Sequence, residues 1–108
     1  MGITKTHLFD PEINTWANLF KALGHPARLS IVMYLVQKRE CVCTEIIDEI
    51  RLSQPTISRH LRVLKDANLI QGNISGPHVC YCINPEIMRN LETFLHIENQ
   101  KINDNTCC

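Results

Sequence analysis

Six cysteines in a chain of 108 residues fall into three close pairs, and their thiols are the groups best able to do chemistry. The pairs are Cys41 with Cys43, Cys80 with Cys82, and Cys107 with Cys108. In a small secreted protein an even number of cysteines indicates disulfides, whereas in a reducing compartment such thiols serve metal or redox chemistry. The N-terminal segment has neither the apolar stretch nor the cleavage site of a secretory signal. We therefore expect a cytoplasmic protein whose thiols are reduced.

Cys41 and Cys43 are candidate ligands for a soft metal ion. In a helix, residues two apart point about 200° from each other and could not hold one ion together. In extended backbone they share a face, about 6.5 Å apart, and side-chain rotation can close that gap. We therefore expect the pair at a helix start, with Thr44 as the N-cap. Two thiolates suit arsenic(III), antimony(III), cadmium, lead or mercury; the alternative is that both are small buried hydrophobic residues.

The other two cysteine pairs have different expected roles. A flexible tail of some ten residues can reach about 30 Å, so Cys107 or Cys108 could supply a further ligand in either subunit. Cys80 and Cys82 alternate with Tyr81 in an expected strand, and we expect them to face solvent as surface residues, with a second soft-metal site as the alternative. The sequence has no Cys-x-x-Cys, catalytic Cys/His grouping or Gly-rich phosphate loop, which argues against an enzyme.

Apolar side chains at helical spacing predict the elements that must hold these residues in place. Ser53 is a good N-cap, and Asn68 tolerates the left-handed conformation at a helix end. Helices are expected over residues 12–23, 26–37, 44–50, 54–68 and 85–97, with a β-hairpin over residues 69–83. This order predicts a winged helix-turn-helix, mainly α with a small β-hairpin (α+β).

A chain of this length suits one domain. We place the winged helix-turn-helix over residues 12–97, between an N-terminal arm (1–11) and a flexible, cysteine-terminated tail (98–108). The end helices carry more apolar residues than so small a core needs, so we expect a homodimer. No apolar run approaches the roughly 18 residues of a membrane helix, so no membrane association is expected.

The helix from Ser53 has a polar, basic face that could read DNA. The formal net charge is zero, which argues against binding by bulk charge, but residues 51–65 hold four basic residues and no acidic one. Arg59 and Arg62 point away from the apolar side of this helix. Arginine pairs with guanine edges or phosphates. The alternative is a solvated face, but the turn before the helix and the hairpin after it favour major-groove reading.

Four segments resemble the ArsR/SmtB family of metal-responsive bacterial repressors: LGHPARLSIVMYL, ECVCTEI, LSQPTISRHLRVLKDANLI and GPHVCYCINP. The resemblance runs from about Trp16 to Leu95. It implies a winged-helix homodimer that binds an imperfect inverted repeat in double-stranded operator DNA and is released by an inducer. With the exposed face of the helix and the tip of the hairpin, it gives the expected DNA-binding residues as Gln54, Thr56, Ser58, Arg59, Arg62, Lys65 and His78.

The CVC segment resembles the arsenic-responsive and cadmium/lead-responsive branches of this family. Ile46 stands where the common arsenic pattern has a third cysteine, so a third ligand must come from elsewhere or the site has only two. The chain lacks the N-terminal cysteine pair of the cadmium/lead branch, which favours arsenic. The zinc ligands that some members carry near the last helix are replaced by Pro85, Ile87, Glu98 and Lys101.

We therefore expect a repressor of a metal(loid)-resistance operon that arsenite or antimonite releases from its operator. The expected metal ligands are Cys41 and Cys43, with Cys107 and Cys108 as the further candidates. A cadmium(II)- or lead(II)-responsive repressor and a thiol redox- or sulfide-responsive repressor of the same fold are the alternatives.

Overall fold

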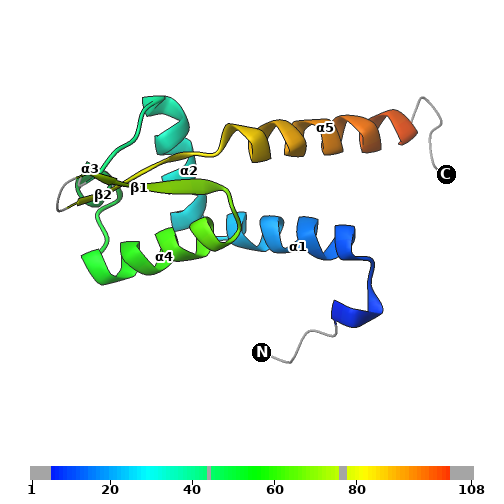
Figure 1. Cartoon of the computed structure of the whole chain (residues 1–108), viewed down its shortest axis with the longest axis horizontal. Coiled ribbons are helices and arrows are strands. Elements are labelled where there is room, and N and C mark those ends of the chain that lie inside the picture. Colours follow the sequence, from blue (N-terminus) through cyan, green and yellow to red (C-terminus); the bar gives the residue numbers. More distant parts are fainter. Residues whose placement is uncertain (1–5, 44, 76–77, 103–108) are drawn as a thin grey trace.

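The computed structural model describes residues 6–43, 45–75 and 78–102. Its elements are, in order, η1 (Thr6–Leu8), α1 (Pro11–Leu23), α2 (Pro26–Lys38), α3 (Glu45–Ile50), α4 (Gln54–Asp66), β1 (Ile70–Ser75), β2 (His78–Ile83) and α5 (Pro85–Ile102). Figure 1 shows α2, α3 and α4 gathered beside the hairpin, with α1 and α5 leading away from it. The expected helix-turn-helix followed by a two-stranded wing is confirmed.

Local sequence signals set where three helices begin. Asp10, His25 and Ser53 each cap a helix by accepting a backbone N–H two or three residues further on. A proline lies in the first two positions of each of these helices, where its missing N–H costs nothing. Asn68 has φ 61° just after α4, as expected for a left-handed residue at a helix end.

One apolar cluster holds α2, α3, α4 and the start of the wing together. Ile57, Leu61 and Leu64 of α4 are buried in it, as their spacing predicted. The most fully buried side chains are Ile31, Leu35, Ile46, Ile57, Leu64, Leu69 and Ile70. Burying one such side chain contributes about 1.5–3 kcal/mol, so α4 is fixed in rotation with its polar face outward.

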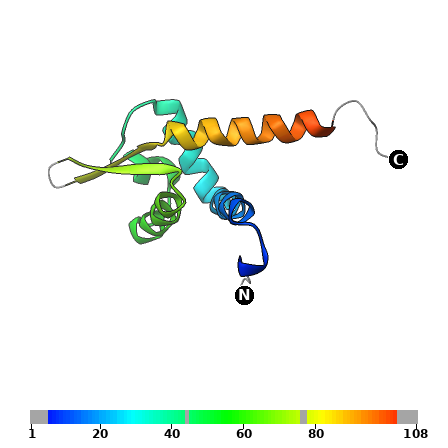
Figure 2. The ribbon, with the colours of Figure 1, turned by 45° about the vertical axis from the view of Figure 1, so that its right-hand side comes forward.

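The wing is an antiparallel pair in which Gly72 lies opposite Tyr81 and Asn73 lies opposite Cys80. Figure 2 shows it projecting from one side of the helical body while α5 extends on the other. A third extended segment, around Val42, joins β2 through a bridge to Tyr81. The wing is therefore attached to the connection between α2 and α3, a feature that the sequence reading did not include.

α5 continues to Ile102, five residues beyond the boundary expected from the sequence. Residues 98–101 are polar, but they contain no glycine or proline, and Lys101 Nζ lies 3.1 Å from Glu98 Oε1 one turn earlier. Polar composition alone does not end a helix. Thr44, Cys107 and Cys108 lie outside the described residues. Across the described ranges, no helix is both long enough and apolar enough to cross a membrane.

Candidate functional site

The CVC segment is extended and hydrogen-bonded to the wing. Val42 N–H donates to the Tyr81 carbonyl at 2.9 Å, and Tyr81 N–H donates to the Val42 carbonyl at 2.8 Å. The Val42 side chain is buried in the apolar core. Because side chains alternate along extended backbone, Cys41 and Cys43 share the face opposite Val42. The expectation that this pair precedes the helix in non-helical backbone is confirmed.

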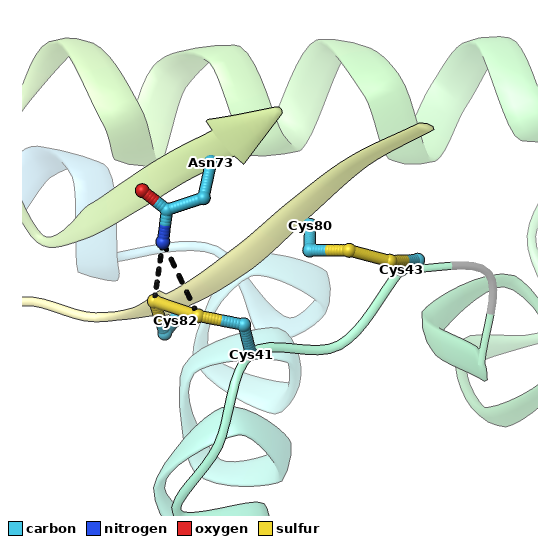
Figure 3. Close-up of a disulfide and its surroundings, with 5 residues drawn as sticks. All are labelled: Cys41, Cys43, Asn73, Cys80 and Cys82. Atoms are coloured by element: carbon cyan, nitrogen blue, oxygen red, sulfur yellow. Dashed lines mark hydrogen bonds between the residues drawn. A yellow bond between two sulfur atoms is a disulfide. The ribbon is translucent and has the colours of Figure 1, made fainter. Parts of the chain in front are cut away.

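The bridge sets each cysteine of this segment opposite a cysteine of β2. Val42 and Tyr81 exchange both hydrogen bonds, so the residue pairs on either side are non-hydrogen-bonded pairs, in which side chains come closest. The Cα atoms of Cys41 and Cys82 are 4.4 Å apart, and those of Cys43 and Cys80 are 4.1 Å apart. The structure joins each pair by a disulfide (Figure 3). These four side chains, on one face of the ladder, are named here the cysteine cluster.

One expectation about these cysteines is wrong. Cys80 and Cys82 were expected to be surface residues, yet Cys80 is only 8% exposed and Cys82 is half-buried. The alternation along β2 placed them opposite Tyr81 correctly, but it could not reveal that residues 41–43 cover that face. The structure pairs the same four cysteines as two disulfides, Cys41 with Cys82 and Cys43 with Cys80, and their reduced state in the cell stays a prediction.

Asn73 of β1 is a member of the site that sequence reasoning missed. Its Nδ2 donates to Cys41 Sγ at 3.3 Å and to Cys82 Sγ at 3.4 Å (Figure 3). The signal was its register in the hairpin, directly opposite Cys80 and therefore on the same face. An amide donor at this point would stabilise negative charge on either sulfur once the disulfide is opened.

An open cavity of about 460 Å³ borders the cysteine cluster at Cys82. Arg39, at the end of α2, and Arg89, on α5, both line it, as does Glu40. The cavity opens Cys82 to solvent on this side. With Arg39, Arg89 and Glu40 among its lining residues, this opening carries one net positive charge.

The exposed face of α4 carries most of the expected DNA-binding residues. Those with exposed side chains on α4 are Gln54, Ser58, Arg59, Arg62 and Lys65. Thr56 is half-buried, and its hydroxyl lies 2.8 Å from Ser53 Oγ at the helix cap. A Cβ added to Gly72 of β1 would lie 3.6 Å from Lys65 Nζ, so Lys65 points toward the wing. His78 opens β2, and its side chain is not among those described.

A polar contact between α2 and α4 orients this face. Arg28 Nε donates to the Ala22 carbonyl at 2.6 Å, and its Nη1 lies 3.4 Å from His60 Nδ1. The rings of His25 and His60 are 4.6 Å apart. Burial, and then the positive charges of His25, Arg28 and Arg59, lower the pKa of His60. A neutral His60 can therefore accept from Arg28 and join α4 to the turn between α1 and α2.

Comparison with known proteins agrees with this architecture. Residues 25–71 match the family described as "Bacterial regulatory protein, arsR family". An uncharacterised HTH-type transcriptional regulator of Methanocaldococcus jannaschii is 44% identical over 68 residues, which are 62% of this chain and 75% of the relative. The arsenical resistance operon repressor of Bacillus subtilis (strain 168) is 36% identical over 94 residues, 84% of this chain and 83% of the relative.

The chain belongs to the ArsR family. A crystal structure of another ArsR family transcriptional regulator superimposes with a TM-score of 0.74 over 91% of this chain and 98% of that protein, at 21% identity. At that identity the similarity shows the fold, the winged helix-turn-helix. Membership of the ArsR family places this chain among DNA-binding transcriptional regulators, and it identifies α3–α4 as its helix-turn-helix.

Proposed function

We propose that this ArsR-family protein is a cytoplasmic homodimeric repressor of a metal(loid)-resistance operon, released from operator DNA when arsenite or antimonite binds the thiolates of Cys41 and Cys43. The observation that carries the proposal is the bridge at Val42, which holds both cysteines on one face immediately before α3. The name of the Bacillus subtilis relative, an arsenical resistance operon repressor, supports arsenic as the first candidate inducer.

DNA binding is proposed for the exposed face of α4. Gln54 at the N-terminal end can pair with adenine, and Arg59 and Arg62 can pair with guanine or phosphate. Lys65 and the wing residue His78 would add contacts at the edge of the groove. In a homodimer, two α4 helices spaced by one helical turn, about 34 Å, would read an inverted repeat in double-stranded DNA.

The dimer is proposed to form through α1 and α5. Trp16 of α1 stacks on Phe94 of α5 with ring centroids 4.3 Å apart, so the two end helices present a joint apolar surface. Ile13, Phe20 and Leu95 remain 58%, 42% and 51% exposed there. An apolar surface of this kind on two end helices is typical of an interface between subunits.

Release would act through the shared core of α3 and α4. Ile46, in the first turn of α3, and Ile57 of α4 belong to one buried cluster. An ion that draws Cys41 and Cys43 together would shift the start of α3, and this packing would pass the shift to α4. A coupling free energy of about 1.4 kcal/mol between inducer binding and DNA binding lowers operator affinity tenfold. A coupling of a few kcal/mol therefore suffices for induction.

A thiol-redox repressor is the second candidate, and the disulfides between β2 and the CVC segment favour it. For each pair, two thiols and one molecule of hydrogen peroxide would give one disulfide and two molecules of water. Oxidation would then fasten the wing to the start of α3 without any metal. Cadmium(II) or lead(II) remains the alternative inducer for the metal-responsive reading.

The test is a titration of fully reduced protein bound to a fluorescent duplex selected from a random DNA library. Fluorescence anisotropy would be followed during separate additions of arsenite, cadmium and hydrogen peroxide. Release at stoichiometric arsenite, with cadmium weaker and peroxide without effect, is expected. Release by peroxide alone would support the redox reading instead, and tight binding unaffected by all three would overturn inducer sensing by these cysteines.

A further inference from the structure

The wing supplies half of a metal site. We infer that, in the reduced protein, Cys80 and Cys82 bind the same thiophilic ion as Cys41 and Cys43, so that the cysteine cluster is one four-sulfur site. This inference rests on the proposed function for its regulatory meaning, but not for its geometry. A cation of tetrahedral preference, such as cadmium(II), would use all four thiolates, whereas trigonal arsenic(III) would leave one unused.

The backbone already places the four sulfurs within reach of one ion. Within each pair the Cα atoms are 4.4 Å and 4.1 Å apart. Between the pairs the separation is that of residues two apart on a strand, about 6.6 Å. Sulfurs of a tetrahedral zinc thiolate site lie about 3.8 Å from each other, so each must lean roughly 1.4 Å along the strand. Rotation about Cα–Cβ supplies that movement without a shift of the backbone.

The surroundings of the cysteine cluster suit a metal thiolate group. Cys80 is 8% exposed and Cys43 and Cys82 are half-buried, while Cys41 is exposed and leaves an entrance for the ion. Four thiolates around a divalent ion carry net negative charge. The Asn73 amide, 3.3 Å and 3.4 Å from two of the sulfurs, supplies the outer hydrogen bond that such sites use.

Charges that line the cavity beside Cys82 also favour the anionic group. Arg39 and Arg89 line the cavity beside Cys82, and Glu40 offsets one of their two charges. With the sulfurs joined as disulfides, no set of three or more His, Cys, Asp or Glu side chains in the described residues stands ready to hold a metal. The inference therefore concerns the reduced protein.

The tail of the same chain cannot compete with the wing for this role. α5 has 18 residues and so carries the chain about 27 Å from Pro85. Figure 2 shows it leading away from the hairpin. Cys107 lies only five residues beyond Ile102, a reach of about 17 Å when fully extended. The shorter tail that follows from the longer α5 leaves Cys80 and Cys82 as the nearest further thiols.

A site shared in this way would connect two DNA-binding elements. Cys41 and Cys43 lead directly into α3, and Cys80 and Cys82 lie in the wing. One ion would then fix the wing relative to the helix-turn-helix, which a site confined to the CVC segment could not do.

X-ray absorption spectroscopy of the reduced, cadmium-loaded full chain tests the ligand set by counting sulfur neighbours. We expect four sulfurs in the wild type and fewer in Cys80→Ser and Cys82→Ser, with cadmium affinity at least about tenfold weaker in each. The double variant Cys107→Ser with Cys108→Ser is the matched control and should keep four. Circular dichroism would verify that every variant is folded.

Three results would overturn the inference: two sulfurs in the wild type, an unchanged count in Cys80→Ser and Cys82→Ser, or no cadmium binding by reduced protein. Operator release measured on the same samples separates the two proposals. Four-sulfur binding without release would leave the site standing and remove the proposed function. If arsenite released Cys80→Ser and Cys82→Ser as readily as the wild type, and the sulfur count were also unchanged, the proposed function would stand. The four-sulfur site would then be ruled out.

Discussion

Val42 and Tyr81 exchange both of their backbone hydrogen bonds, and this single bridge brings the four cysteines together. Val42 belongs to the segment before α3 and Tyr81 to the wing. Because each is flanked by cysteines on both sides, the antiparallel register leaves every one of these cysteines facing another. The candidate inducer site therefore forms only when the segment before α3 pairs with β2 of the wing.

Asn73→Ala should weaken metal binding while leaving the fold intact. The change removes the amide that donates to two sulfurs, and loss of an outer-shell hydrogen bond typically lowers metal affinity about 10–100-fold. Competition titration of cadmium against a chelator would measure the loss. Asn99→Ala, which removes an exposed amide on α5, is the control and should keep wild-type affinity. Equal affinities of the two variants would show that Asn73 has no part in the site.

Arg59→Ala should reduce sequence-specific DNA binding. The side chain is exposed on α4, and an arginine paired with a guanine edge contributes about 1–3 kcal/mol of discrimination. Anisotropy titrations on the selected duplex and on a scrambled duplex, at several salt concentrations, would measure this. Lys101→Ala removes one positive charge on α5 and is the matched control. If Arg59→Ala distinguished the selected duplex from the scrambled one as well as the wild type does, Arg59 would have no part in sequence recognition.

Ser53→Ala should destabilise the protein by about 1 kcal/mol, because Ser53 Oγ accepts the Thr56 N–H at the start of α4. It should also weaken DNA binding, since its hydroxyl orders Thr56 2.8 Å away. Ser53→Asp, another good N-cap, should retain most of the stability. Urea unfolding of the three proteins is the measurement, and equal midpoints would mean that the cap contributes nothing.

Stability should decrease as the pH falls below about 6.5, and His60 should be one cause. Its pKa is lowered in the folded state, chiefly by burial and then by His25, Arg28 and Arg59. Between that lowered pKa and the ordinary value, the unfolded chain binds more protons than the folded one, so stability rises with pH across this window. His60→Gln should flatten the slope in urea unfolding at several pH values. His96→Gln on α5 is the control, and an equal slope in wild type and His60→Gln would contradict this assignment.

Local signals in the sequence were sufficient for the helices and the wing. Ser53, the prolines at the helix starts and Asn68 act through their own backbone, so their effects can be inferred residue by residue. The end of α5 was predicted five residues too early, because the segment after residue 97 is mostly polar. That segment contains no residue that would end a helix, and α5 continues to Ile102.

The cysteine cluster could not be predicted from the periodicity of the sequence. Alternation along β2 gave the correct face for Cys80 and Cys82, but whether that face is solvated depends on a strand partner distant in sequence. The same is true of the Arg28–His60 contact, which joins residues 32 positions apart. Two Cys-x-Cys segments in extended backbone could have suggested such pairing, because an antiparallel register matches them cysteine to cysteine.

The central claim, that thiolates before α3 control operator binding, is tested most directly by comparing wild type with Cys43→Ser under stoichiometric arsenite. Both proteins would be reduced and bound to the same fluorescent duplex, and the fraction still bound would be read by anisotropy. We expect arsenite to release the wild type and to leave Cys43→Ser on the DNA. Equal release of both proteins would contradict it.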